Sequence, residues 1–153
     1  MCYMTNARDI MSKKIITIET SSSVVEIAKI MNKNNISCIV LTENEKPCGI
    51  ITERDYLSKI IAHNKKASDL IPTQIMSSPF TTVSAVALVD DVAQTMLENE
   101  IRHVVVMDKD HPIGIITITD FLKHINTIVT DSDEYRKDLY EGLFEEHEYW
   151  DRQ

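Results

Sequence analysis

The sequence predicts an α/β (α+β) fold made of two similar repeats, each with the order strand–helix–strand–strand–helix, followed by a C-terminal helical extension. Three observations predict it. The pattern Gly-Ile-Ile-Thr-x-x-Asp occurs twice, at 49–55 and 114–120, although the chain has only three glycines. The flanking segments align without a gap, and short β-rich runs alternate with stripes of helical spacing. Because such a unit buries little surface alone, we expect the repeats to pack through their sheets as a pseudo-two-fold pair.

The duplication covers most of the chain. A shift of 65 residues aligns 10–61 with 75–126, and 18 of these 52 positions are identical. Chance does not produce this agreement, so the chain carries two copies of one supersecondary unit. The sequence therefore divides into a first repeat at 1–65, a second repeat at 66–130 and a tail at 131–153.

Local signals place the elements of each repeat. Ser23 and Glu26 stand at capping-box spacing where a stripe of apolar residues with helical spacing begins. The first repeat is expected to contain a strand at 15–18, a helix from Val24, strands at 36–41 and 48–52, and a helix at 53–63. The second is expected to contain a strand at 80–83, a helix at 89–99, strands at 103–107 and 112–117, and a helix from Ile118.

Composition narrows the class of protein. No apolar run approaches the ~18 residues that a membrane span needs, and the first residues contain no apolar stretch of signal-peptide length, so we expect a cytoplasmic protein. A net charge of −8 argues against nucleic acid as a partner. The three cysteines form no C-x-x-C pair, which favours neither disulfides nor zinc. Cys38 lies in an apolar run and is expected to be a buried, inert thiol.

The repeated Thr-x-x-Asp pattern has two interpretations. In the simpler one, Thr52 and Asp55 form a capping box at the start of a helix, and Thr117 and Asp120 form another. In the other, the pattern is a ligand site, because it lies where a strand leads into a helix N-terminus. The glycine that opens each pattern favours the second interpretation, since it lets a backbone or a ligand approach closely.

Residues 1 to about 130 resemble a pair of CBS domains, the tandem regulatory modules named after cystathionine β-synthase. Their hallmark, Gly, two apolar residues, Ser or Thr, any two residues and Asp, stands at Gly49–Asp55 and again at Gly114–Asp120. The Asp-Ile-Met sequence at 9–11 and the Ile-Arg-His-Val-Val-Val sequence at 101–106 are also similar to the family.

The resemblance implies a non-catalytic sensor that binds adenosine nucleotides (AMP, ADP or ATP) in two clefts between the repeats and signals to a partner. In such pairs the Asp accepts both ribose hydroxyls, which suits an acceptor-only carboxylate. The first implied cleft combines Thr52, Arg54 and Asp55 with Thr82, Val83, Arg102 and His103. The second combines Thr117, Thr119 and Asp120 with Thr17, Ile18, Ser37 and Cys38.

The two implied clefts differ in charge. The first has Arg102 and His103 where the second has Ser37 and Cys38, and Arg54 could reach a phosphate in either. Because arginine recognises phosphate with a charged, planar fork, we expect the first cleft to take a phosphorylated adenosine. The second suits a less charged ligand or stays empty. The simpler alternatives are a solvated charge at Arg102 and a packing role for His103.

Other functions are also compatible with the sequence. The resemblance also allows S-adenosylmethionine or methylthioadenosine as the ligand, and it implies a homodimer. An enzyme acting on nucleotides is less well supported, because no nucleophile has an adjacent base and no cluster has metal-ligand spacing. Asp55 and Asp120 belong to separate clefts and so form no acid–base pair.

The tail from Asp131 differs from the repeats. It has nine acidic and three basic residues, and its expected helix has an aromatic and aliphatic stripe at Tyr135, Leu139, Tyr140, Leu143 and Phe144. This stripe either folds back on the body of the protein or contacts another subunit or a protein partner. His147 has no second ligand at metal-binding spacing, so no metal site is expected.

Overall fold

The computed structural model describes residues 5–128, with side chains through residue 125. The residues up to Thr117 form one compact unit, and helix α6 (Ile118–Ile128) belongs to a second unit. The expected helix from Ile118 is therefore present, whereas the tail lies outside the described residues.

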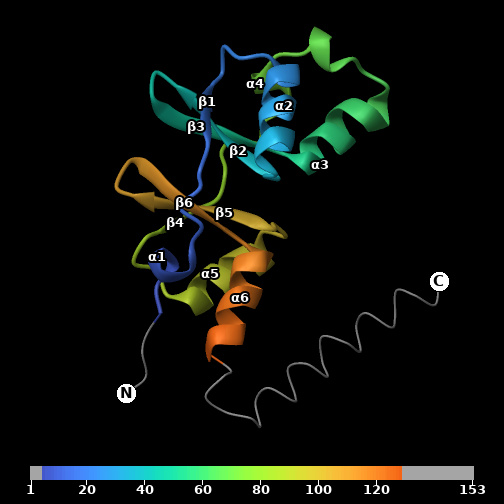
Figure 1. Cartoon of the computed structure of the whole chain (residues 1–153). Coiled ribbons are helices and arrows are strands. Elements are labelled where there is room, and N and C mark those ends of the chain that lie inside the picture. Colours follow the sequence, from blue (N-terminus) through green and yellow to red (C-terminus); the bar gives the residue numbers. More distant parts are fainter. Residues whose placement is uncertain (1–4, 129–153) are drawn as a thin grey trace, which may run out of the picture. The chain divides into compact units, whose positions relative to one another are not determined.

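The first sheet has the strand order β1–β2–β3. β1 runs parallel to β2, and β2 runs antiparallel to β3. Its elements are β1 (Thr17–Glu19), α2 (Val24–Asn34), β2 (Cys38–Glu43) and β3 (Lys46–Thr52). Helix α2 begins where expected, because the Ser23 side chain accepts a hydrogen bond from the Glu26 backbone N–H at 3.0 Å. The predicted strand–helix–strand–strand order is confirmed (Figure 1).

β2 begins two residues later than the sequence predicts. The Asn35 backbone adopts the left-handed conformation with φ 51°, and the Ile36 N–H donates to the Met31 carbonyl at 3.0 Å. Ile36 therefore belongs to the C-terminal cap of α2 rather than to the strand. The helix expected at 53–63 is also less regular than predicted. It consists of α3 (Glu53–Asp55), a π-helical turn η1 (Tyr56–Ile60) and a 3₁₀ turn η2 (Ile61–His63).

The second sheet repeats the first, with the strand order β4–β5–β6 and the same parallel and antiparallel pairings. Its elements are β4 (Thr82–Ser84), α5 (Val89–Glu98), β5 (His103–Asp108) and β6 (His111–Thr117). Three of the four predicted ranges agree with these elements to within one residue, and β4 begins two residues later than expected.

Each sheet is buried on both faces. Ile39 and Leu41 of β2 pack with Val24 and Ile27 of α2 in one apolar cluster. Because side chains alternate along a strand, Val40 points to the opposite face, yet only 1% of it is exposed. β3 contacts β6, so the two repeats meet through their sheets as predicted. Burial on both faces explains why the middle strands are runs of apolar residues rather than alternating ones.

The segments that precede each first strand cross to the other repeat. Helix α1 (Ala7–Ile10) packs beside α5 and β6, and the Ala7 and Arg8 amides donate to the carbonyls of Ala87 and Ala85, which follow β4. Ser12 then pairs with Ile115 of β6.

The equivalent segment of the second repeat makes the reciprocal crossing. After the 3₁₀ turn η3 (Ala67–Asp69), helix α4 (Pro72–Ile75) inserts Ile75 into the core of the first repeat, and Ser77 pairs with Ile50 of β3. These crossings tie the repeats together through backbone hydrogen bonds, and the division at residues 65 and 66 stays a prediction.

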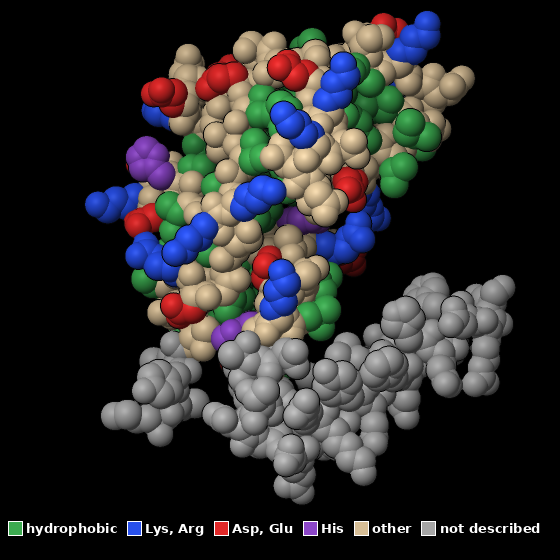
Figure 2. Space-filling model, in the orientation of Figure 1, with side chains coloured by type: hydrophobic (Ala, Val, Ile, Leu, Met, Phe, Trp, Pro, Cys, Tyr) green, Lys and Arg blue, Asp and Glu red, His purple; other side chains and the backbone are tan. Residues whose placement is uncertain are grey.

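The surface of the described residues carries both signs of charge. On the face shown in Figure 2, basic and acidic side chains are interspersed. No helix among residues 5–128 has the length and apolar character needed to cross a membrane. Cys38 is 7% exposed, and burial followed by the charge of Asp55 raises the pKa of its thiol to about 12. The expected buried thiol is therefore confirmed.

Candidate functional site

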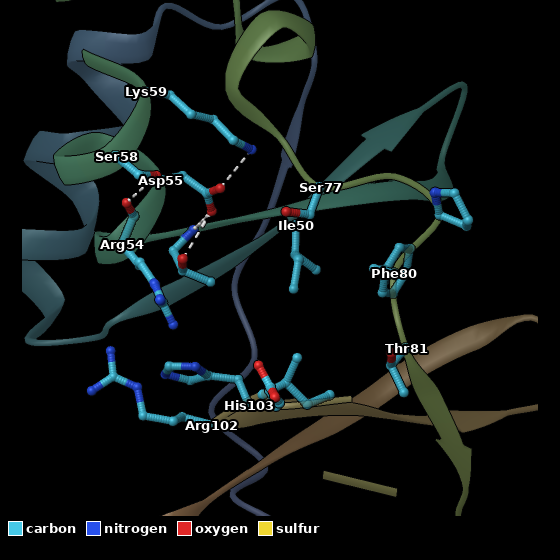
Figure 3. A pocket seen from close by; sticks show the side chains of 14 residues that line it. Ile50, Arg54, Asp55, Ser58, Lys59, Ser77, Phe80, Thr81, Arg102 and His103 are labelled. Atoms are coloured by element: carbon cyan, nitrogen blue, oxygen red, sulfur yellow. Dashed lines mark hydrogen bonds and ion pairs between the residues drawn. The ribbon is translucent and has the colours of Figure 1, made fainter. Parts of the chain in front are cut away.

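A cavity of about 360 Å³ lies between the two repeats, within the unit that ends at Thr117. This volume is in the range of small-molecule sites. The end of β3, α3 and η1 form one side, and the segments before β4 and β5 form the other (Figure 3). Its lining residues are Ile50, Thr52, Arg54, Asp55, Ser58, Lys59, Ser77, Pro79, Phe80, Thr81, Glu100, Ile101, Arg102 and His103.

Asp55 is the buried acid of the cavity, with 6% of the residue exposed. Its Oδ2 accepts hydrogen bonds from the Thr52 backbone N–H at 2.7 Å and from the Thr52 hydroxyl at 2.8 Å. Its Oδ1 forms an ion pair with the Lys59 ammonium at 2.7 Å. The carboxylate therefore caps the helix and lines the cavity at once, so the two interpretations of Thr-x-x-Asp do not exclude each other.

Two guanidinium groups reach the cavity from different repeats. Arg54 lies in α3, and Arg102 immediately precedes β5. Figure 3 shows both side chains on the same side of the cavity, with His103 beside Arg102. Between residues 5 and 128, neither guanidinium makes a hydrogen bond or an ion pair. Two guanidinium groups without partners among the described residues can bind an anionic group such as a phosphate with several charge-assisted hydrogen bonds.

His103 joins the two repeats at the edge of the cavity. Its Nε2 lies 2.6 Å from the Ser37 hydroxyl oxygen, at hydrogen-bonding distance. Burial, together with the positive charge of Arg102, lowers the pKa of the imidazole, and Glu53 opposes this shift. The folded protein therefore favours the neutral ring.

This shift makes stability depend on pH in one direction. Above about pH 6.5 the ring is neutral in both folded and unfolded chains, so it contributes no pH dependence. As the pH falls below 6.5, the unfolded chain takes up the proton first, and the free energy of unfolding falls. We expect urea unfolding at pH 7.5 and pH 5.5 to show a larger loss for wild type than for His103→Gln. An equal loss in the two proteins would contradict this prediction.

The structure brings most of the first-cleft residues together. Thr52, Arg54, Asp55, Arg102 and His103 all line the cavity. Thr82 and Val83 lie in β4, outside the lining, and the two residues just before β4, Phe80 and Thr81, line it instead. The chain approaches β4 across the cavity, so the contacts come from the segment before the strand.

The residues implied for the second cleft are placed as follows. Thr17 and Ile18 lie in β1, Ser37 contacts His103, and Cys38 begins β2. Thr117 ends β6, whereas Thr119 and Asp120 lie in α6, which belongs to the other unit. A second cleft therefore stays a prediction.

Lys59 is a charged side chain of the cavity lining that the sequence analysis did not single out. It follows Asp55 by four residues, which is the spacing of helical ion pairs, so the signal was present in the sequence. The apolar lining at Phe80 had no comparable signal, because it depends on the path of the chain before β4. Among the described residues, no group of three His, Cys, Asp or Glu side chains could hold a metal ion.

Two consecutive stretches of the chain, residues 7–62 and 69–127, match the CBS domain family. The chain belongs to this family, and its two repeats form a CBS domain pair, as the repeated pattern predicts. A CBS pair is a regulatory module that binds adenosine-containing ligands.

Relatives and solved structures agree with this assignment. The uncharacterized protein MK0525 of Methanopyrus kandleri is 32% identical over 137 residues, which is 88% of this chain and 70% of that protein. The L-aspartate semialdehyde sulfurtransferase of Methanocaldococcus jannaschii is 37% identical over 119 residues, but this chain spans only 22% of its length.

The solved CBS domain pair of protein MJ0100 is 33% identical to this chain and superposes on it with a TM-score of 0.73. The match covers 81% of this chain and 98% of that one. The structure of MJ0100 is a complex with 5′-methylthioadenosine and S-adenosyl-L-methionine.

Proposed function

We propose that this CBS pair senses AMP, ADP or ATP in the cavity at Asp55 and passes the resulting conformational change to a protein partner. The observation that supports this most strongly is the combination, in one cavity, of a buried carboxylate with two guanidinium groups that have no partner among the described residues. The carboxylate offers acceptors to a ribose diol, and the guanidinium groups offer donors to a phosphate. Phe80 provides an aromatic side chain in the same lining for the base.

The two repeats contribute different side chains to the proposed binding site. Asp55 and Arg54 come from the first repeat, whereas Arg102 comes from the second. A phosphate that binds both guanidinium groups would neutralise two like charges that face one cavity and would join the repeats. Ligand binding is thereby linked to the relative positions of the two sheets, which is a means of signalling.

Replacing Arg102 tests the phosphate-binding part of this proposal. A charge-assisted hydrogen bond contributes about 1.5–3 kcal/mol, so Arg102→Ala should weaken AMP binding by about tenfold or more. Adenosine, which has no phosphate, should bind the variant and wild type about equally. Calorimetric titration of both proteins with AMP and adenosine measures this difference. Equal weakening of both ligands would show that Arg102 only shapes the cavity.

A second candidate ligand follows from the comparison with MJ0100. Because that CBS pair was solved with 5′-methylthioadenosine and S-adenosyl-L-methionine, the same ligands are candidates here. Neither carries a phosphate. 5′-Methylthioadenosine would leave the Arg54 and Arg102 guanidinium groups without an anion, whereas the carboxylate of S-adenosyl-L-methionine could pair with one of them. Including both in the titration decides between the classes: tighter binding of either one than of AMP would favour this second candidate.

Catalysis is not part of the proposed function. The Ser37 hydroxyl lies 2.6 Å from His103 Nε2, but Ser37 does not line the cavity. The chain also spans only a small part of the relative that is named as an enzyme. The remaining alternative is a nucleotide-acting enzyme. Steady release of phosphate from ATP by wild type, and not by Asp55→Ala, would support that alternative.

We further propose a cytoplasmic homodimer. Leu57 and Ile61 expose 62% and 67% of their surfaces on the helical segment 53–63, and an apolar surface of this kind suits contact with a second copy. The acidic aromatic tail at 131–153 is proposed as an additional contact for a partner or a subunit, and it lies outside the described residues.

A further inference from the structure

Lys59 binds the same carboxylate that the proposed ligand needs. Its ammonium pairs with Asp55 Oδ1 at 2.7 Å and donates to the Ile75 carbonyl at 2.6 Å, with a longer contact of 3.4 Å to the Met76 carbonyl. Figure 3 shows Lys59 and Asp55 facing each other along one wall of the cavity. The lysine side chain is 36% exposed, whereas that of Asp55 is 8% exposed.

Counting acceptor positions shows why this contact matters. A carboxylate has two oxygens and about four lone-pair positions. The described residues fill three of them with the Thr52 N–H, the Thr52 hydroxyl and the Lys59 ammonium. About one position is left, whereas a ribose diol that donates both of its hydroxyls to Asp55 needs two.

A diol must therefore displace one of the three protein donors. The Thr52 N–H belongs to the backbone at the end of β3, and the Thr52 hydroxyl is held two bonds from the same backbone. Lys59 is the donor that moves most easily, because its side chain is long and partly exposed, and because its ammonium keeps the Ile75 carbonyl as an acceptor.

We infer that Lys59 competes with the ribose of the ligand for Asp55, and that it sets how strongly the cavity discriminates between ribose and deoxyribose. This inference rests on the proposed function, because it takes Asp55 as the diol acceptor. A ligand with two hydroxyls breaks the Lys59–Asp55 pair, whereas a 2′-deoxy ligand uses the one remaining position and leaves the pair intact. Lys59 therefore lowers the preference for ribose below the value that Asp55 alone would give.

The test compares AMP with 2′-deoxyAMP in wild type and in Lys59→Met. The ratio of the two dissociation constants, 2′-deoxyAMP over AMP, should rise about fivefold in the variant. AMP has to break the ion pair in wild type but not in the variant, whereas 2′-deoxyAMP leaves the pair intact in wild type and so gains nothing from its removal. A purely structural role for Lys59 would change both constants together and leave the ratio unchanged. Lys59→Arg keeps the charge and should restore a ratio close to that of wild type.

Lys14→Met is the matched control, because Lys14 also donates its ammonium to a backbone carbonyl, that of Asn34 at 3.0 Å, but does not line the cavity. Its ratio should equal that of wild type. If Lys59→Met does not fold, Lys59→Gln keeps a donor for the Ile75 carbonyl and should give the same rise. An unchanged or lower ratio in folded Lys59→Met or Lys59→Gln overturns this inference alone. If wild type binds neither nucleotide, the proposed function fails, and this inference fails with it.

Discussion

Replacing Gly49 with valine is expected to lower the free energy of unfolding by about 3 kcal/mol, the upper part of the range for overpacked positions. A Cβ at Gly49 would lie 2.6 Å from Met76 Sδ and 3.0 Å from the Ser77 carbonyl oxygen. The methionine side chain can turn away, but the carbonyl belongs to the backbone segment that pairs with Ile50. The substitution therefore forces that segment away from β3.

Thermal unfolding measures this effect, and for a chain of this size the midpoint should fall by roughly 10 °C. Gly114→Val should have a similar cost, because a Cβ there would lie 2.9 Å from the Ser12 carbonyl oxygen. Lys46→Val, an exposed substitution at the start of the same strand, is the control and should change the midpoint little. A midpoint for Gly49→Val near that of Lys46→Val would show that close packing of the crossing segment does not require glycine.

Replacing Asp55 with alanine should remove the response to nucleotide. The variant loses the acceptor for the ribose hydroxyls, and two charge-assisted hydrogen bonds correspond to a roughly hundredfold or greater loss of affinity. It also loses a helix cap, so the free protein should be less stable by about 1 kcal/mol.

Melting curves with and without AMP separate these two effects. At a hundredfold excess over its dissociation constant, a ligand stabilises wild type by about 2.7 kcal/mol, and Asp55→Ala should show almost none of this gain. Asp55→Asn is the matched control for shape, because it keeps one acceptor oxygen. We expect it to retain part of the gain. A full AMP response in Asp55→Ala would mean that Asp55 is only a cap.

The fold was largely predictable because its signals are local and occur twice. The second helix of the first repeat was predicted as regular, yet it contains a π-helical turn at Tyr56–Ile60 that no local pattern in the sequence indicates. The reciprocal crossing of Ser12 and Ser77 to the opposite repeats was not predicted either. It depends on contacts between distant segments, which hydrophobic periodicity within one segment does not encode.

The candidate site was predictable to the extent that it follows the repeated pattern. Asp55 and Arg54 are in or beside the pattern, and Arg102 was found by comparing the repeats at equivalent positions. Phe80 and Thr81 were missed in favour of Thr82 and Val83, because the assignment took the strand itself rather than the chain that leads into it. Lys59 was missed because Asp55, its partner in the ion pair, was interpreted only as a helix cap and as an acceptor for the ligand.

The most direct test is calorimetric titration of AMP into wild type, Asp55→Ala and Asp120→Ala. If phosphorylated adenosine binds between Asp55 and Arg102, wild type and Asp120→Ala should bind AMP with similar affinity, and Asp55→Ala should bind it at least about a hundredfold more weakly. Equal losses in the two aspartate variants, or no binding of AMP by wild type, would contradict the assignment of nucleotide sensing to this cavity.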